Sequence, residues 1–347
     1  MLVNEYRYAL LLYREDGSSI GTAPVAVDWG PATECARFDH ARRGIMPLGA
    51  EDAGAIEPLW HRTEGEPLMR GFRVAFNGAG RRVTSDFPTS YLTDAAVRAS
   101  SEFVRQGKLA AGDKYLFQAV ALAGNGNGKP ATGLALEVVE EKPDLPLIES
   151  RLDDFRRRST PAGTVDSGID ADDMPVFVPR RVLDEVAELT RGATGRETGG
   201  ILIGHLHRDP SLPEIFVELT AQIPAEHTLG TVDKLTFTAE TWSAASAAIR
   251  LRNRGEIYCG YFHSHPVGEW CKARGCSPEQ QKSCRLAKDF FSEDDVAVMR
   301  AAFPRGYSIG LVANDAAYLD LSFSMFGWRE GKILPRGFYV LEEESNA

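Results

Sequence analysis

One stretch of the sequence decides the fold: Ile257-Tyr258-Cys259-Gly260-Tyr261-Phe262-His263-Ser264-His265-Pro266. Its first six residues are apolar or small on both faces, which is typical of a strand buried at the centre of a sheet. Side chains alternate along a strand, so His263 and His265 project from the same face, where one metal ion can reach both. The stretch therefore predicts a sheet whose central strand ends in a metal-binding pair.

A catalytic zinc ion usually takes three protein ligands and leaves a fourth position for water. Beside the two histidines, Asp295 is the candidate for the third ligand. Zinc lowers the pKa of bound water toward about 7, but a base must still take the proton and return it to the leaving group. We expect Glu197 to be that base, and the hydroxyl of Ser292 to donate a hydrogen bond to the oxyanion of an attacked carbonyl.

Each fragment also has an ordinary structural explanation. Ser292 and Asp295 have the spacing of a helix N-cap and its capping-box partner, a role that can coexist with one in a metal site. A second pair with the same spacing, His205 and His207, precedes the polar residues Arg208-Asp209-Pro210. That context predicts solvated histidines in a turn, so spacing alone does not identify a site.

The order of the parts is more specific than any one of them. Glu-x-x-Gly-x-Leu-x-Gly from Glu197 to Gly204, then His-Ser-His-Pro, then Ser-x-x-Asp from Ser292 to Asp295, resembles the JAB/MPN-domain metalloenzymes, also called the JAMM family. The resemblance covers roughly residues 175–341. It implies that the two histidines and the aspartate bind Zn²⁺. It also implies that the glutamate is the general acid/base and that the serine helps to hold the tetrahedral intermediate.

The same resemblance implies a hydrolase that acts at the C-terminal tail of a ubiquitin-like protein. Family members cleave isopeptide bonds there, and some prokaryotic relatives remove or mature small ubiquitin-like or sulfur-carrier proteins. The expected partners are a ubiquitin-like protein and its conjugates, with activating-like and conjugating-like enzymes of the same pathway. Residues 227–236 fall where relatives contact the extended tail, and we expect this loop to clamp the peptide by adding it to a sheet edge.

Two other functions stay open on the same fold. One is a catalytically silent MPN-type scaffold, although such domains usually lack ligands that this chain retains. The other is a hydrolase of small peptides or cysteine-containing metabolites. A zinc nucleoside deaminase would need His-x-Glu together with Pro-Cys-x-x-Cys, and the sequence contains neither.

The sequence departs from the resembled family between the histidines and the Ser-x-x-Asp motif. Residues 267–291 form an insert of 25 residues, a longer interval than in the family, and we expect it to line the rim of the site. The insert contains Cys271, Cys276 and Cys284, so that with Cys259 four of the five cysteines lie within 26 positions. Clustered thiols without a secretory signal favour metal over disulfides. A second, structural zinc and simple buried thiols are both open.

Composition favours a cytoplasmic protein with two cored domains, since 43% of its residues are hydrophobic and 25% charged. The formal net charge of −10 argues against a nucleic-acid partner, because phosphate binding needs a basic face. The stretch from Met1 to Asp16 carries five charged residues around a short apolar run. We therefore expect neither a signal peptide nor a membrane helix there, and no membrane partner.

Three regions are predicted along the chain, for a protein of the α/β (α+β) class. Residues 159–173 are small, acidic and almost without large apolar side chains, which predicts a flexible linker, with bounds at residues 151–174. Residues 1–150 predict an N-terminal mixed α+β domain without a catalytic constellation, which by elimination binds the substrate or a partner. Residues 175–347 contain the JAB/MPN region, with helices flanking a mixed sheet.

Periodicity and turn signals predict the individual elements. Strands are expected, besides the one bearing the histidines, at residues 6–13, 72–76, 114–123, 134–139, 176–178, 199–204, 215–222, 307–313, 319–326 and 338–341. Helices are expected to start at Thr93, Pro179, Thr238 and Ser292.

Overall fold

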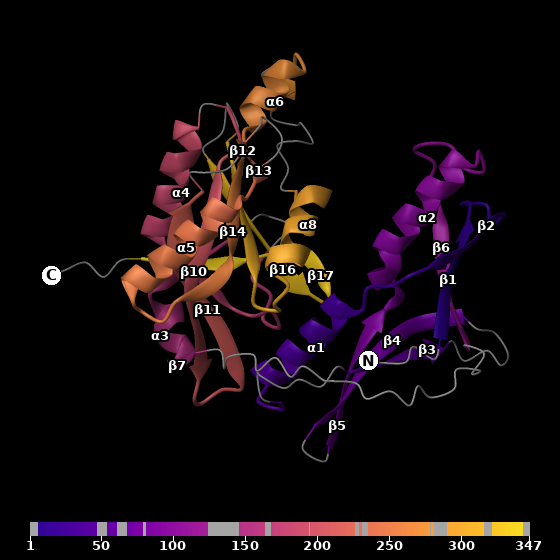
Figure 1. Cartoon of the computed structure of the whole chain (residues 1–347), viewed down its shortest axis with the longest axis horizontal. Helices are drawn as coiled ribbons and strands as arrows, with labels where there is room; N and C mark the ends of the chain where they lie inside the picture. Colours follow the sequence, from indigo (N-terminus) through magenta and orange to yellow (C-terminus); the bar gives the residue numbers. More distant parts are fainter. Residues whose placement is uncertain are drawn as a thin grey trace. The chain divides into compact units, whose positions relative to one another are not determined.

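The computed structural model describes residues 6–46, 54–60, 68–78, 81–123, 146–163, 168–193, 195–225, 229–230, 235–277, 279–280, 290–315 and 321–342. The chain divides into two compact units, each with its own sheet (Figure 1). The N-terminal unit comprises residues 1–40, 49–143 and 330–332, and the C-terminal unit comprises residues 41–48, 144–329 and 333–347. Both units combine helices with strands, so the predicted mixed α/β class is confirmed.

The N-terminal unit contains an antiparallel sheet of six strands in the order β2-β1-β6-β4-β3, with β5 paired to β4. Its strands are β1 (Tyr6–Tyr13), β2 (Ser19–Val25), β3 (Ala55–Trp60), β4 (Leu68–Gly78), β5 (Arg81–Pro88) and β6 (Leu116–Ala123). Its helices are α1 (Gly30–Arg42), the short 3₁₀ helix η1 (Thr89–Leu92) and α2 (Thr93–Arg105).

The predicted strands at residues 6–13, 72–76 and 114–123 correspond to β1, β4 and β6. The strand predicted at residues 134–139 lies outside the described residues. Thr93 is the first residue of α2 rather than its cap, because its hydroxyl donates to the Ser90 carbonyl in the preceding turn, at 2.6 Å.

The C-terminal unit contains a mixed sheet of ten strands in the order β17-β16-β15-β14-β10-β11-β9-β18-β8, with β7 paired to β10. The strands are β7 (Leu147–Glu149), β8 (Ser159–Ala162), β9 (Val176–Pro179), β10 (Gly199–Asp209), β11 (Glu214–Pro224), β14 (Ile257–His265), β15 (Ile309–Asn314), β16 (Ser322–Arg329), β17 (Lys332–Arg336) and β18 (Phe338–Leu341). A separate hairpin joins β12 (Leu229–Gly230) to β13 (Leu235–Thr236).

Five helices of the C-terminal unit are described: α3 (Leu152–Arg157), α4 (Arg180–Gly192), α5 (Ala239–Arg252), α6 (Val267–Ala273) and α8 (Glu293–Ala302). Ala245 of α5 and Met299 of α8 pack in one cluster with Ile201, Ile203 and Tyr261 of the sheet. Both helices therefore bury their apolar sides against the face of β10 and β14 that carries these residues. None of the helices that the structure describes has the length and apolar character needed to cross a membrane.

The described part of residues 151–174 contains ordered secondary structure, unlike the flexible linker that its composition predicted. Helix α3 buries Leu152 and Phe155 in a cluster with Phe177 of β9. Strand β8 pairs with β18 in the main sheet. Two apolar side chains before the acidic stretch of residues 159–173, and the pairing of β8 at its start, thus give the described part of this region a fixed structure.

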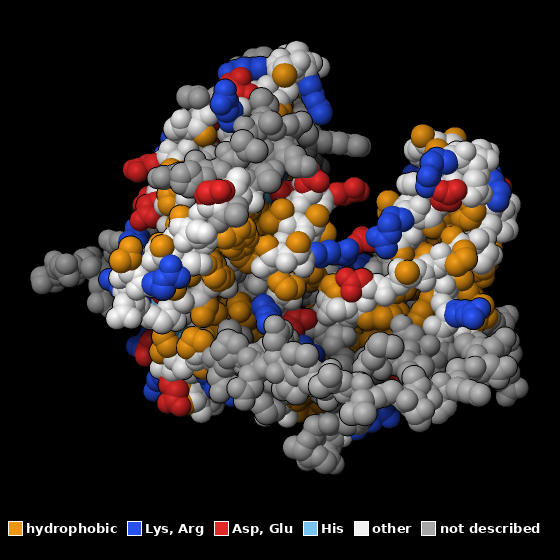
Figure 2. All heavy atoms as spheres, in the orientation of Figure 1, with side chains coloured by type: hydrophobic (Ala, Val, Ile, Leu, Met, Phe, Trp, Pro, Cys, Tyr) orange, Lys and Arg blue, Asp and Glu red, His pale blue; other side chains and the backbone are white. Residues whose placement is uncertain are grey.

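Acidic and basic side chains are interspersed over the described surface of the C-terminal unit that Figure 2 shows. On that face, the described residues form no continuous basic surface. This distribution agrees with the negative net charge of the chain.

Strand β14 lies inside the sheet, paired antiparallel with β10 and parallel with β15. This arrangement confirms the central buried strand that its apolar run predicted. A Cβ atom added at Gly260 would lie 1.8 Å from the Ile309 carbonyl oxygen of β15. Since that atom belongs to the backbone, it cannot rotate away, and only glycine fits the pairing.

The variant Gly260→Ala should therefore destabilise the chain by about 1–3 kcal/mol or more, because overpacking forces strand β15 to shift. Urea unfolding measures the change in the free energy of unfolding. Gly192→Ala at the end of α4, where nothing lies within 4 Å of the added Cβ, is the control and should change stability little. Equal stability of the two variants would contradict this account of β14.

Candidate metal centres

The end of β14 brings two buried histidines together with a carboxylate. His263 and His265 are each only 2% exposed, and their Nε2 atoms lie 2.9 Å apart. The Oδ1 atom of Asp295 is 3.3 Å from the Nε2 atom of His263. Two ligand atoms at zinc-binding distance from one tetrahedral ion are about 3.3 Å apart. The three side chains therefore have the spacing and the chemistry of a centre for a single zinc-sized ion.

The capping box of α8 orients Asp295. Ser292 is the N-cap, and its hydroxyl oxygen accepts a hydrogen bond from the Asp295 backbone N–H at 3.1 Å. In return, Oδ2 of Asp295 accepts from the Ser292 backbone N–H at 2.8 Å and from the Ser292 hydroxyl at 2.7 Å. With Oδ2 occupied in this way, Oδ1 faces His263. Capping and metal-site geometry thus coexist in one motif.

Burial and hydrogen bonding set the protonation of this group. Burial, reinforced by the charge of His263, lowers the pKa of His265 to about 3. Burial opposes ionisation of Asp295, but hydrogen bonds from His263 and Ser292 outweigh it and lower its pKa to about 2. At neutral pH the group therefore offers a neutral imidazole and an ionised carboxylate, which are the forms that bind metal ions.

Glu197 lies two residues before the start of β10 and is partly exposed. Its neighbour Thr198 is fixed to β14 by two hydrogen bonds. The Thr198 carbonyl accepts from the Ser264 N–H at 2.8 Å, and the Thr198 N–H donates to the Ser264 hydroxyl at 3.0 Å. Burial is the largest cause of a Tyr261 pKa well above its usual value, and the negative charges of Asp295 and Glu197 add to it. Glu197 is therefore placed at the histidine end of β14, within electrostatic reach of the centre.

Aromatic residues of the insert pack against the histidines. The ring of His265 stacks on Phe290 with 4.5 Å between centroids and lies 5.1 Å from the ring of Trp270 in α6. The ring of His263 lies 5.9 Å from that of Phe291. These contacts place aromatic residues of the insert against the histidines, while its expected place at the rim of the site stays a prediction.

The cysteines of the insert region that the structure describes form no disulfide bonds. Cys259 and Cys271 are buried, and burial raises the pKa of Cys259 above its usual range. Cys284 lies outside the described residues. Within the described ranges neither candidate metal group includes a cysteine, so a structural zinc at these thiols stays a prediction.

A second group of candidate metal ligands consists of His205, His207 and Glu218, whose ligand atoms lie within 4.8 Å of one another. The prediction that these histidines are solvated in a turn is wrong. Strand β10 continues to Asp209, and His207 is only 4% exposed with its ring stacked on Phe216 of β11. Because β11 pairs with β10 along this whole length, the chain turns only after the histidines.

Comparison with known proteins supports a family assignment for part of the chain. Residues 179–269 match the family model described as prokaryotic homologs of the JAB domain. This range includes Glu197 and both histidines of β14, whereas Ser292 and Asp295 lie beyond it. Comparison with curated proteins finds no match.

Among solved structures, the chain is similar to the solution structure of protein DSY2949 from Desulfitobacterium hafniense. The identity is 17%, the TM-score is 0.32, and the match covers 49% of this chain and 94% of that chain. The match to the family model shows that the C-terminal unit contains a domain of the prokaryotic JAB family, within residues 179–269. This finding confirms the resemblance to the JAB/MPN family that the sequence indicated.

Proposed function

We propose that this chain is a zinc-dependent peptidase of the JAMM type, which hydrolyses the bond after the C-terminal tail of a ubiquitin-like protein. The proposal rests on the convergence of His263, His265 and Asp295 in a chain that contains a prokaryotic JAB domain. Three protein ligands leave a fourth position for water. When bound, zinc polarises the attacked carbonyl and lowers the pKa of a water ligand to about 7.

Glu197 is the general acid/base of the proposed reaction. Its position before β10 leaves the carboxylate partly exposed at the histidine end of the central strand. From there it takes a proton from the attacking water and returns that proton to the leaving nitrogen. The leaving group is a lysine amine in a conjugate or a peptide nitrogen in a precursor.

Ser292 holds the ligand carboxylate, and its proposed second role is to stabilise the oxyanion. Its one hydroxyl proton is donated to Oδ2 of Asp295 at 2.7 Å. To donate to an oxyanion, the hydroxyl must give up that bond, while Oδ2 keeps the second bond from the Ser292 backbone N–H. The capping box therefore lets the serine serve both roles without releasing Asp295.

The substrate tail is proposed to bind in an extended form beside the hairpin of β12 and β13. These two short strands pair only with each other among the described residues. A peptide added to their edge would gain main-chain hydrogen bonds, and small tail residues such as glycine could pass the centre without a clash. The partners would be a ubiquitin-like protein, its conjugates, and activating-like and conjugating-like enzymes in the cytoplasm. The N-terminal unit would bind the target or one of these partners.

The test uses the purified full chain and ubiquitin-like proteins that carry a fluorescent amide on their C-terminal glycine. We expect release of the fluorophore, its loss after treatment with a chelator, and its recovery on addition of Zn²⁺. Dipeptides are the comparison substrates, which test for a hydrolase of small peptides. Cleavage of dipeptides alone would indicate a hydrolase of small peptides, and cleavage of neither substrate by zinc-loaded protein would favour a silent scaffold.

A further inference from the structure

The group formed by His205, His207 and Glu218 lies away from the proposed catalytic centre. Gly199 at the start of β10 pairs with His263, whereas His207 is eight residues further along the same strand. At about 3.3 Å of rise per residue, roughly 26 Å of strand separate the two positions. The group therefore needs an explanation of its own.

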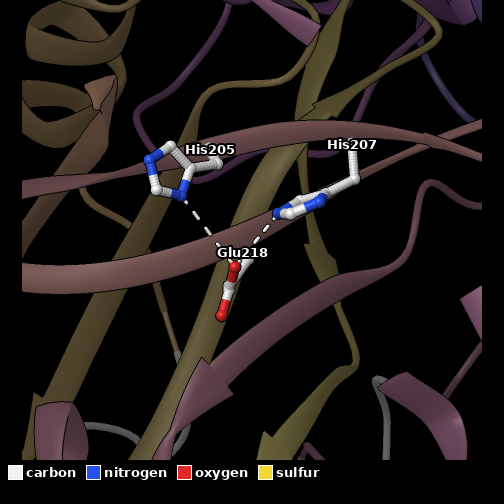
Figure 3. A group of neighbouring side chains, drawn as sticks. All are labelled: His205, His207 and Glu218. Atoms are coloured by element: carbon white, nitrogen blue, oxygen red, sulfur yellow. Dashed lines mark hydrogen bonds and ion pairs between the residues drawn. The ribbon is translucent and has the colours of Figure 1, made fainter. Parts of the chain in front are cut away.

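Strand pairing brings the three side chains to one face of the sheet. Figure 3 shows His205 and His207 from β10 and Glu218 from β11 pointing toward one another. His205 stands opposite Glu218 in the register, and His207 is two residues further along the same strand. The Oε2 atom of Glu218 lies 3.0 Å from Nε2 of His207 and 4.0 Å from Nδ1 of His205. Two imidazoles and a carboxylate are a donor set suited to zinc and neighbouring transition metals.

The outer hydrogen bond of His205 directs a ring lone pair toward Glu218. Nε2 of His205 lies 2.9 Å from the Arg254 carbonyl, which can only accept, so this nitrogen carries the proton. The other nitrogen of the neutral ring, Nδ1, then presents a lone pair to Glu218. Nδ1 of His207 lies 2.9 Å from the Ser150 hydroxyl, which can donate or accept, and Nε2 faces Glu218. When the hydroxyl accepts from Nδ1, Nε2 presents its lone pair to a metal ion. Metal-binding histidines are commonly oriented by such hydrogen bonds.

The Nδ1 atom of His205 faces a carboxylate oxygen of Glu218 at 4.0 Å. A cation between these two atoms removes the repulsion of their lone pairs. A proton on Nδ1 would do so by forming an ion pair, whereas a metal ion would also bind Nε2 of His207, which lies 3.0 Å from the same oxygen. The side chains of His205 and Glu218 are 14% and 25% exposed, so an ion and a water ligand can reach them. The stacked ring of Phe216, 4.9 Å from His207, holds that ligand in place.

We infer that His205, His207 and Glu218 bind a divalent transition-metal ion of the zinc class, separate from the JAB-type centre. The ion would tie β10 to β11. Through the hydrogen bond from His207 to Ser150, it would also fix the residue that follows β7. Its role would be to stabilise this end of the sheet rather than to take part in hydrolysis.

The test counts zinc in a double variant, His263→Ala with His265→Ala, so that the proposed catalytic centre does not contribute. The full chain is equilibrated with buffered micromolar Zn²⁺ and analysed for metal after removal of free ions. We expect about one zinc per chain, and a fall to background when Glu218→Gln or His205→Gln is added. Glutamine at position 205 can still donate to the Arg254 carbonyl but offers no Nδ1 ligand.

His40→Gln is the matched control, because His40 is a buried histidine of the N-terminal unit whose Nε2 lies 3.1 Å from the Ser85 hydroxyl. This variant should keep its zinc. Zinc should also raise the unfolding temperature of the double variant in a concentration-dependent way, and Glu218→Gln should abolish that shift. The inference would be overturned if the double variant folded but bound no zinc. It would also be overturned if the zinc content stayed the same after Glu218→Gln and after His205→Gln. Neither outcome depends on hydrolytic activity.

Discussion

Replacing Glu197 with glutamine is expected to reduce cleavage of a ubiquitin-like tail by about 10²–10⁴-fold, the usual contribution of a general acid/base. Glutamine keeps the size of the side chain but cannot take and return a proton. Because Glu197 belongs to neither group of candidate metal ligands, the zinc content should not change. The combination of lost turnover and retained metal is specific to a proton-transfer role.

The measurement is the turnover number at saturating substrate, recorded across pH beside elemental analysis of the same preparation. The ascending limb that a general base gives to the pH profile should be absent from the Glu197→Gln variant. Glu188→Gln, on the exposed side of α4, is the matched control and should behave like the unmodified chain. A Glu197→Gln variant that cleaves at the unmodified rate would show that another group acts as the base.

The sequence predicted the parts of the site that depend on local geometry. The spacing of His263 and His265 requires only that the segment be a strand, and its apolar run made that prediction reliable. Ser292 and Asp295 form their capping box within one turn of helix, so their bonding also follows from local spacing. The approach of Asp295 to the histidines is different. It joins residues about 30 positions apart, and only the family resemblance indicated it.

The second group shows why long-range pairing escapes sequence reasoning. Glu218 reaches His205 across a hairpin, in a register that contains an irregularity between Ile203 and Gly204. An extra residue in one strand changes which side chains share a face, and the sequence gives no signal for it. The linker prediction failed for a related reason. The composition of residues 159–173 does not reveal that β8 pairs with β18, or that Leu152 and Phe155, just before them, join a hydrophobic cluster elsewhere in the fold.

Removing Asp295 is expected to abolish hydrolysis and to empty the proposed catalytic centre of zinc. The carboxylate supplies the only negative charge among the three proposed ligands, and its Oδ1 lies 3.3 Å from Nε2 of His263. Asp295→Ala also removes one half of the capping box, which should cost about 1 kcal/mol of unfolding free energy. Loss of metal and loss of helix stability would therefore coincide in this variant.

Asp295→Asn separates the two effects. The amide oxygen of asparagine can still accept from the Ser292 backbone N–H, but the side chain has lost its charge. We expect the asparagine variant to lose zinc and activity as fully as the alanine variant, while its metal-free unfolding free energy stays close to that of the unmodified chain. Zinc is counted in a His205→Gln background, so that the second group does not contribute. If Asp295→Asn kept its zinc and cleaved normally, Asp295 would be a helix cap and not a metal ligand.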